Sequence, residues 1–342
     1  MSSVTADERL ADVGRLRRML IRPELGAVVG AVVVFAFFAT QSEVFRSVAG
    51  IANWLDPAAT LGIMAVAIAL LMIGGEFDLS AGVLTGTTGL VLVTLATRFG
   101  LNVWLAMLAG LAVALAVGFV NGLIVTRTRL PSFIVTLGTF LMLQGVNLGV
   151  TKTLTGTVQV AGLRRADGYE SARTVFGGTV GDSGFRVAII WWVLVTVVAT
   201  WVLMRSRAGN WIFAVGGNEQ AARAVGVPAA RTKIALFMTT AVAAWLVGSI
   251  LALRYTSVQA SSGIGQEFIY IIAAVIGGCL LTGGYGSAIG ASIGAVIFGM
   301  ADKGIVFLGW DADWFKFFLG AMLLLATLAN RLVRRYAEEV KH

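Results

Sequence analysis

Histidine and cysteine are almost absent from this chain. Among 342 residues there is one histidine, His342, and one cysteine, Cys279. These numbers exclude histidine-based catalytic triads, cysteine–histidine pairs, histidine-based zinc sites and any disulfide within the chain. The phosphate-binding pattern G-x-x-x-x-G-K-[ST] is missing as well. We therefore expect a protein that is not an enzyme, has no catalytic residues, holds no metal or other cofactor, and does not itself hydrolyse ATP.

Charge is also scarce, whereas apolar residues are abundant. Only 13% of the residues are charged and 58% are hydrophobic, although a soluble protein carries about 25% charged residues. One soluble core could not bury so much apolar surface, so the composition predicts an all-α polytopic membrane protein. The net charge of +8 comes from residues at the ends of apolar runs, without interleaved aromatic patches, so no nucleic acid partner is expected.

Apolar runs of about 17–25 residues predict ten transmembrane helices. The second and third runs are short for a full crossing. The transmembrane domain then covers residues 25–330, between an N-terminal segment, 1–24, and a C-terminal tail, 331–342. The approximate limits of the runs are 25–41, 57–74, 81–97, 101–125, 131–151, 186–204, 234–253, 267–282, 287–308 and 314–330.

The distribution of basic residues predicts the orientation. With ten spans, both termini lie on one side of the membrane. If that side is the cytoplasm, its segments hold 16 of the 26 lysines and arginines, which fits the positive-inside rule. Residues 152–185 then form an outer loop, and residues 205–233 form a cytoplasmic loop too long for a simple turn.

A faint internal repeat has a constant offset of 182 residues. Gly122-Leu123-Ile124 aligns with Gly304-Ile305-Val306, and Leu137-Gly138 aligns with Leu319-Gly320. The same offset lays spans two to five over spans seven to ten. The first set begins outside and the second inside, so the repeat is expected to be inverted, as in many transporters whose substrate path lies between the repeats.

A polar segment interrupts the apolar sequence after the second run. It reads Gly74-Gly75-Glu76-Phe77-Asp78-Leu79-Ser80-Ala81-Gly82. Glycines such as Gly75 allow the chain to leave helical geometry, and Ser80 could cap the following helix. Two interpretations stay open: a cytoplasmic turn with solvated acids, or a functional helix break at Asp78, where a carboxylate amid apolar sequence needs water or a partner.

The cytoplasmic loop contains a second distinctive segment, residues 216–227. Asn218 is a plausible N-cap, the following residues propagate as a helix to Val225, and Gly226 ends it. Glu219, Gln220 and Arg223 are expected on its exposed face. Such a helix suits docking to a partner, although a surface helix without a partner fits the same pattern.

Amide side chains lie inside the predicted spans at Asn121, Gln144 and Asn147. They could hydrogen-bond the hydroxyl groups of a sugar, or they could join helices to one another, which is the commoner role. Asp302 and Lys303 lie side by side in the ninth run and are expected to compensate each other's charge.

Four segments together resemble one family, the ribose-type sugar permeases of bacterial ABC importers. Gly74 to Gly82 looks like the family's G-G-x-x-D-L-S-x-G signature, and Ala214 to Gly226 is similar to its cytoplasmic coupling segment. Leu130-Pro131-Ser132-Phe133-Ile134-Val135-Thr136-Leu137-Gly138-Thr139 resembles its P-x-F-I-x-T-L-G stretch. Gly283-Gly284-Tyr285-Gly286-Ser287-Ala288-Ile289-Gly290 resembles its G-G-x-G-S-x-x-G turn. The residues Glu76 and Phe77 depart from the small or aliphatic pair of many members.

The resemblance implies the type II permease fold of the vitamin B12 importer and a set of partners. These are a second permease copy, cytoplasmic ATPase subunits, and a periplasmic sugar-binding protein. It places ATPase docking on Glu219, Ala221, Ala222, Arg223 and Gly226. The candidates for the helix break or the translocation path are Gly75, Asp78, Ser80, Asn121, Phe133, Gln144 and Asn147.

The resulting expectation is an inner-membrane permease that moves a monosaccharide or similar polyol by alternating access, without covalent chemistry. One alternative is an ABC permease for nucleosides or branched-chain amino acids. Another is a cation-coupled secondary transporter, which would need a buried acid that titrates, such as Asp78, Glu76 or Asp302.

Overall fold

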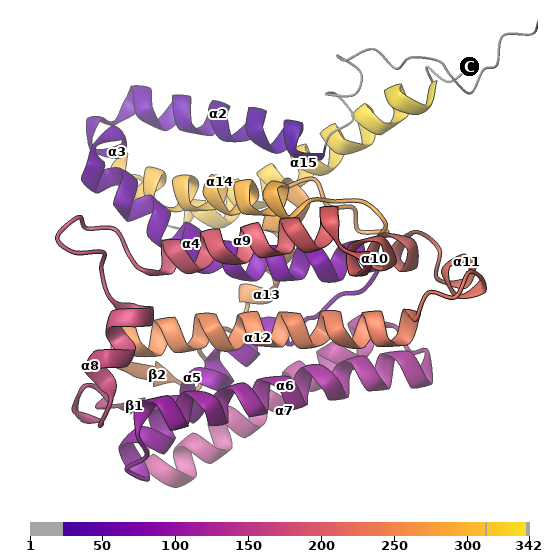
Figure 1. The fold of residues 1–342 in the computed structure, drawn as a ribbon. Coiled ribbons are helices and arrows are strands. Elements are labelled where there is room, and N and C mark those ends of the chain that lie inside the picture. The colour runs from indigo at the N-terminus through magenta and orange to yellow at the C-terminus, as the bar shows by residue number, and fades with distance from the viewer. Residues whose placement is uncertain (1–22, 312, 340–342) are drawn as a thin grey trace, which may run out of the picture.

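The computed structural model describes residues 23–311 and 313–339, and within them the chain is a bundle of helices (Figure 1). The residues of the predicted N-terminal segment up to 22 lie outside the described part. The helices that match the ten predicted runs are α2 (Pro23–Gln41), α4 (Val48–Ile73), α5 (Ala81–Arg98), α6 (Val103–Thr128), α7 (Ser132–Thr155), α9 (Ala188–Arg205), α12 (Ala229–Tyr255), α13 (Gln266–Ile276), α14 (Ala288–Phe307) and α15 (Trp314–Glu339).

Eight of these helices are long and apolar enough to cross a membrane. The other two are shorter apolar segments, α13 and residues 314–328 of α15. The prediction of an all-α polytopic membrane protein is therefore confirmed. Two details of the prediction were wrong: the second span is not short, because α4 has 26 residues, and the run 267–282 is not one helix, because α13 ends at Ile276.

The remaining elements are short and lie at the ends of the bundle. Two three-residue strands, β1 (Gln159–Ala161) and β2 (Ser257–Gln259), pair antiparallel with Val160 opposite Val258. The short helical elements are α3 (Glu43–Arg46), η2 (Leu163–Arg165), α8 (Tyr169–Ala172), η3 (Arg173–Gly177), α10 (Arg207–Gly217) and α11 (Glu219–Ala224). Helix α10 lies in the predicted cytoplasmic loop, residues 205–233.

Helix α4 forms the centre of the bundle because it is apolar on every face. In its most apolar 18-residue window 83% of the residues are buried, compared with 11% for α2 and 22% for α7 and α9. A helix that is hydrophobic all round belongs inside a protein. The outer helices instead expose large apolar side chains, such as Val197 and Trp201 on α9, which suits contact with lipid.

The two halves of the chain pack as an inverted pair. Moving the bounds of α4, α5, α6 and α7 by 182 residues brings them within a few residues of α12, α13, α14 and α15. Helix α4 packs mainly on α14, and its counterpart α12 packs mainly on α6. The start of α4 meets the end of α12 through an ion pair of Asp56 with Arg254, and the end of α4 meets the start of α12, where Gly74 faces Leu236. The counterpart helices therefore run in opposite directions.

Close helix packing depends on small residues at the crossings. A Cβ added at Gly118 of α6 would lie 2.8 Å from the carbonyl oxygen of Phe237 on α12. A Cβ at Gly294 of α14 would lie 2.1 Å from the carbonyl oxygen of Ala273 on α13. Such close approach of backbones is the usual reason for glycine at membrane helix interfaces.

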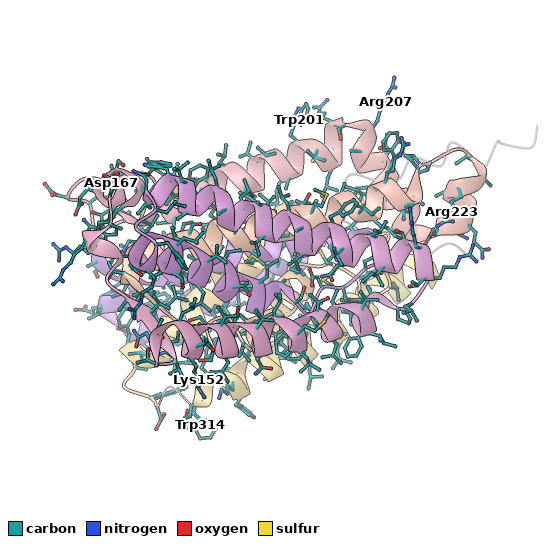
Figure 2. All side chains as sticks on the ribbon, turned by 90° about the horizontal axis from the view of Figure 1, so that it is seen from below. Lys152, Asp167, Trp201, Arg207, Arg223 and Trp314 are labelled. Atoms are coloured by element: carbon teal, nitrogen blue, oxygen red, sulfur yellow. The ribbon has the colours of Figure 1, made fainter. Side chains whose placement is uncertain are left out.

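The long loops extend from opposite ends of the bundle. Figure 2 shows Asp167 at one end and Arg207 and Arg223 at the other. Both ends of the described chain lie at the end that carries α11 (Figure 1). We call this end the coupling end and the end with β1 and β2 the far end. Helix α15 continues to Glu339, beyond the predicted limit of 330.

Candidate functional site: a junction at the coupling end

The chain leaves helical geometry between α4 and α5, and we call residues 74–80 the first break. Gly75 has φ +84°, which only glycine adopts without strain. Asp78 accepts hydrogen bonds from the backbone N–H of Ser80 at 2.8 Å and from its hydroxyl at 2.6 Å. The side chain of Ser80 does not cap α5 as expected, because its backbone has helical angles, φ −78° and ψ −12°, whereas a capping residue is typically extended.

A buried hydrogen-bond chain ties the first break to α6 and α7. The amide of Asn121 donates to the Ser80 hydroxyl at 3.0 Å, and the hydroxyl of Thr139 donates to the Asn121 oxygen at 2.6 Å. The N–H groups of Phe77 and Leu79 donate to Ser132 and Thr136 of α7, each at 3.0 Å. The first break is therefore a fixed structure in which every named polar group has a partner.

The predicted path residues are only partly brought together. Asp78, Ser80 and Asn121 are each at most 1% exposed and join in the chain just described. Asn147 is buried elsewhere and donates to Thr87 at 3.0 Å. Gln144 is half-buried on α7, and Phe133 is 53% exposed near the start of that helix.

Three glycine pairs from distant parts of the sequence meet beside the first break. They are Gly74-Gly75, Gly216-Gly217 and Gly283-Gly284. The N–H of Gly284 donates to the carbonyl oxygen of Ile73 at 2.8 Å. A Cβ at Gly216 would lie 1.7 Å from that same oxygen, and one at Gly283 would lie 2.8 Å from the Cα of Gly75. Only backbone without side chains can pack so closely, which gives three of the four family-like motifs one shared location.

An ion network joins the first break to α11. The Nζ of Lys233, near the start of α12, lies 2.5 Å from a carboxylate oxygen of Glu76 and 2.5 Å from one of Glu219. Glu219 also pairs with Arg223 on the next turn of α11. Glu76 is 6% exposed, so its charge is compensated inside the protein. We call Glu76, Glu219 and Lys233 the ion bridge.

The electrostatics of Glu219 follow from its two cationic neighbours. Burial alone would raise the pKa of its carboxyl, but hydrogen bonds and charge attraction from Lys233 and Arg223 outweigh burial and hold the pKa below its usual value of 4.5. The carboxylate is therefore ionised at neutral pH. Its contribution to stability is present above the ordinary pKa and is lost as the pH falls through the lowered one.

Lys233 was not predicted as a site residue. In the sequence it is only one of several basic residues of the cytoplasmic loop. Glu76, Glu219 and Lys233 come from three separate segments, and no spacing rule relates them. Only packing of α4, α11 and α12 at one end of the bundle brings them together.

Helix α11 has the expected start and end. The Asn218 side chain accepts from the N–H of Ala221 at 3.0 Å, and Gly226 has φ +85° just after the helix. Glu219 was expected on the exposed face of the helix, but its side chain turns toward Lys233. Ala222 is only 4% exposed and packs against Val215 and Ala229. The face left open carries Gln220, Ala221, Arg223 and Ala224, with Val225 79% exposed beside it.

A polar pocket of about 660 Å³ separates α11 from the turn between α6 and α7. Glu76, Glu219 and Lys233 form one side, and Arg129 and Leu130 of the turn form part of the other. Arg129 has φ 60° at the end of α6, an uncommon conformation for a residue with a Cβ. The pocket adjoins the open face of α11, so a protein surface bound there would reach both elements.

A second pocket, of about 350 Å³ and with a mixed polar and apolar lining, lies at the far end between the two halves. It is bounded by residues 256–265, the segment between α12 and α13, which we call the second break. The polar and aromatic side chains that line it are Thr60, Thr85, Tyr255, Ser257, Ser262, Gln266, Tyr270 and Phe298. Hydroxyl and amide groups beside aromatic rings suit a small polyhydroxylated molecule.

Glu267 lies directly beside this second pocket. One oxygen of its carboxylate accepts from the N–H of Gly265 at 3.1 Å, while the other oxygen is buried without a hydrogen-bond partner.

Among the described residues there is no group of three or more His, Cys, Asp or Glu side chains that could hold a metal ion. Asp302 and Lys303 of α14, which were expected to compensate each other's charge, form an ion pair in which the Lys303 Nζ lies 3.0 Å from the Asp302 Oδ2.

These features define the class of protein: a polytopic membrane protein with two inverted halves, a fixed helix break and a short helix at one end that is connected to that break. Residues 50–327 match the sequence family described as branched-chain amino acid transport system / permease component. The chain belongs to this permease family, and it is a transport subunit rather than an enzyme.

Characterised relatives are similar over almost the whole chain. The ribose import permease protein of Escherichia coli (strain K12) is 31% identical over 309 residues, which cover 90% of this chain and 93% of the relative. The fructose import permease protein of Rhizobium meliloti is 29% identical, covering 83% and 78% of the two chains. The xylose transport system permease protein of Escherichia coli (strain K12) is 28% identical, covering 91% of each. No solved structure gives a significant match.

Proposed function

We propose that this chain is the membrane-spanning subunit of an ATP-driven importer for a monosaccharide or a similar polyol. The relatives that support this substrate class are import permeases for ribose, fructose and xylose. The structural observation that carries the mechanism is the ion bridge, because it connects α11 to the first break. Movement of α11 is then passed to α4 and α12 and alternates access to the path between the halves.

The proposed partners follow from this mechanism. Cytoplasmic ATPase subunits bind the open face of α11, a periplasmic binding protein delivers the sugar to the far end, and a second permease copy completes the complex. In this proposal the coupling end is cytoplasmic, so that both termini are cytoplasmic and residues 152–185 face outward in the bacterial inner membrane. The basic residues at the coupling end support this orientation.

Docking of the ATPase is tested at the open face of α11. Val225→Asp replaces an exposed apolar side chain with a charged one. The variant is expected to lose copurification of the ATPase, while the melting temperature of the permease stays unchanged. Arg164→Asp, in η2 at the far end, is the control for charge alone. If the Val225→Asp complex retains its ATPase in full amount and stimulates it normally, α11 is not the docking element.

The orientation is tested by labelling single cysteines in whole cells, in a background of Cys279→Ser. A cysteine at position 165 is expected to react with an impermeant reagent added outside, whereas one at position 218 is expected to be protected. The reverse pattern would contradict the proposed topology.

The identity of the solute is tested on the complex. The complex, purified with its binding protein, is expected to carry a monosaccharide that mass spectrometry of the released ligand identifies. A nucleoside or a branched-chain amino acid would support the alternative to which the name of the sequence family points. A cation-coupled secondary transporter would instead accumulate solute in liposomes from the permease alone, driven by an ion gradient.

The second pocket is the proposed contact point for the sugar within this chain. It lies between the halves at the end where the binding protein would dock, and its lining offers hydroxyl, amide and aromatic groups. The amide nitrogens of Asn121 and Asn147 each donate one hydrogen bond, to Ser80 and Thr87 respectively, which favours a role for them in joining helices. Gln144 and Phe133 stay candidates for the path.

A further inference from the structure

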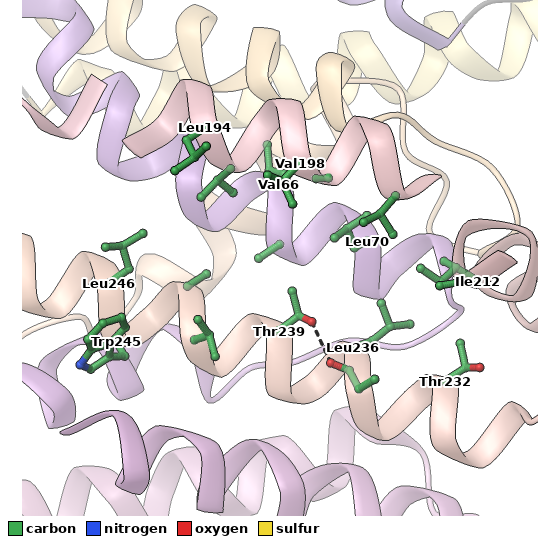
Figure 3. Close-up of a pocket in the computed structure, with 18 of the residues that line it drawn as sticks. Val66, Leu70, Leu194, Val198, Ile212, Thr232, Leu236, Thr239, Trp245 and Leu246 are labelled. Atoms are coloured by element: carbon green, nitrogen blue, oxygen red, sulfur yellow. Dashed lines mark hydrogen bonds between the residues drawn. The ribbon is translucent and has the colours of Figure 1, made fainter. Parts of the chain in front are cut away.

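A third cavity, of about 790 Å³, lies between α4, α9 and α12. It shares no lining residue with the other two pockets, although one end of it comes close to the junction, where its lining residue Leu236 faces Gly74. Its walls are almost wholly apolar, and Figure 3 shows Val66 and Leu70 of α4 and Leu194 and Val198 of α9 lying opposite Leu236 of α12. Val198 is 51% exposed, so the cavity opens beside the apolar outer surface of α9. In a membrane, that opening faces lipid. We call this cavity the lipid groove.

Four of the polar side chains that line the lipid groove have their donors satisfied within the protein. Thr232 and Thr239 donate to the carbonyl oxygens of Pro228 and Ala235, each one turn earlier in the chain. The indole N–H groups of Trp191 and Trp245 donate to the carbonyl oxygens of Val175 and Met107. These four donors are therefore not available to a ligand, and a sugar lying along the groove would lose much of its hydration without compensation.

Only one end of the groove is charged. Arg231, near the start of α12, lines this end together with Trp211 of α10, and no carboxylate of the described residues pairs with it. Arg205 and Arg207, at the junction of α9 and α10, are exposed at the same end of the bundle. Figure 2 shows Arg207 on this end. A ligand that matches the groove has a long apolar body and one anionic head.

We propose that the lipid groove binds a phospholipid, with an acyl chain between α9 and α12 and the anionic phosphate at Arg231. Basic pockets between transmembrane helices are suited to anionic headgroups, and tryptophan side chains are enriched at membrane interfaces. A second copy of this chain fits less well, because two-fold pairing of the groove with itself would bring the arginines of both copies together. The proposal is independent of the transported solute.

The test titrates the full-length chain, stripped of lipid in detergent, with phosphatidylglycerol and measures bound lipid by native mass spectrometry. Val198→Trp fills the groove and is expected to weaken binding at least tenfold. Val197→Trp is the matched control, since Val197 is 60% exposed on the same helix but does not line the groove. Thr239→Trp fills the groove from α12 and replaces Val198→Trp if that variant does not fold.

The headgroup is tested separately. Arg231→Gln is expected to weaken phosphatidylglycerol binding about fivefold, and Arg127→Gln, an exposed arginine at the end of α6 and outside the groove, is expected to leave it unchanged. Phosphatidylcholine is expected to bind the unaltered chain more weakly than phosphatidylglycerol. Equal binding by the groove-filling variants and Val197→Trp, equal binding of the two lipids, or a shift from dimer to monomer in Val198→Trp without loss of lipid would each overturn the proposal.

Discussion

The first and second breaks occupy corresponding positions in the two halves of the chain but are built differently. The first break, between α4 and α5, contains two acids and is held by Asp78, Asn121 and the ion bridge. The second break, between α12 and α13, contains no charged residue and is held by backbone pairing of β2 with β1. The helices are repeated, but the segments joining them have diverged.

This difference fits two tasks at two ends of the membrane. Charges at the first break connect it to a helix on the surface, so that force can pass between them. Hydroxyl and amide groups around the second break instead line a pocket between the halves. Variants at the two breaks are expected to separate a break that transmits movement from a break that contacts solute.

The largest effect is expected for Lys233→Met, which removes the cation of the ion bridge and leaves Glu76 buried without a counter-ion. We expect the free energy of unfolding to fall by about 3 kcal/mol, together with loss of ATPase stimulation by the loaded binding protein. Thermal denaturation and ATPase assays measure both. Lys303→Met is the control, because its pair with Asp302 is about one-third exposed, so a smaller loss of stability and no loss of ATPase stimulation are expected.

The next effect concerns the meeting of the glycine pairs. Gly216→Ala brings a Cβ into the carbonyl oxygen of Ile73, and it is expected to destabilise the protein by about 1–3 kcal/mol. In Gly217→Ala, the neighbouring substitution, the Cβ meets nothing within 4 Å and replaces glycine in a helix, so stability is expected to be unchanged or slightly higher. Equal melting temperatures of the two variants would contradict the observed packing.

Asp78→Ala tests the interior of the first break. Losing the acceptor for two donors of Ser80 is expected to cost about 1–3 kcal/mol and to reduce uptake while the complex stays assembled. Ser262→Ala, which removes one hydroxyl acceptor in the exposed part of the second break, is expected to cost less than ~1 kcal/mol. Normal uptake by an equally expressed Asp78→Ala variant would mean that the first break has no role in the transport cycle.

The smallest effect is expected at the second break, and it concerns the preference between two sugars rather than the rate of transport. Gln266→Ala removes an amide from the second pocket and is expected to change the ratio of uptake of two competing sugars by about fivefold, the equivalent of one hydrogen bond. Lys233→Met is expected to lower uptake of both sugars in proportion. An unchanged ratio in Gln266→Ala would remove the second pocket from the path.

Much of the fold could be predicted from the sequence because the membrane imposes simple rules. A segment crossing lipid must be apolar and helical, so ten apolar runs led to ten helices. The 182-residue offset was visible in only a few matches, yet it predicted which helices correspond. One error was local: α13 ends at Ile276 because Gly278 has φ +94° and the N–H groups of Gly278 and Cys279 bond back to the carbonyl oxygens of Val275 and Ala274, a glycine cap within an apolar run.

The local chemistry of α11 was also determined by the sequence. Asn218 caps the helix and Gly226 follows its end, because capping depends on residues within one or two turns. By contrast, the burial of Ala222 and the inward turn of Glu219 depend on Val215, Ala229 and Lys233. These partners come from neighbouring elements, and no local pattern specifies how those elements pack.

The sequence by itself determined the membrane class, the helices, their repeat and the four motifs, because each is encoded by composition or by neighbours along the chain. Only the tertiary structure decided that three glycine pairs meet at one place and that Lys233 joins Glu76 to Glu219. It also decided that Asn121 serves the first break. The physical reason is that both features are contacts between distant segments. Backbones that approach too closely to leave room for a Cβ, and charges paired between separate segments, exist only after the two inverted halves have packed together.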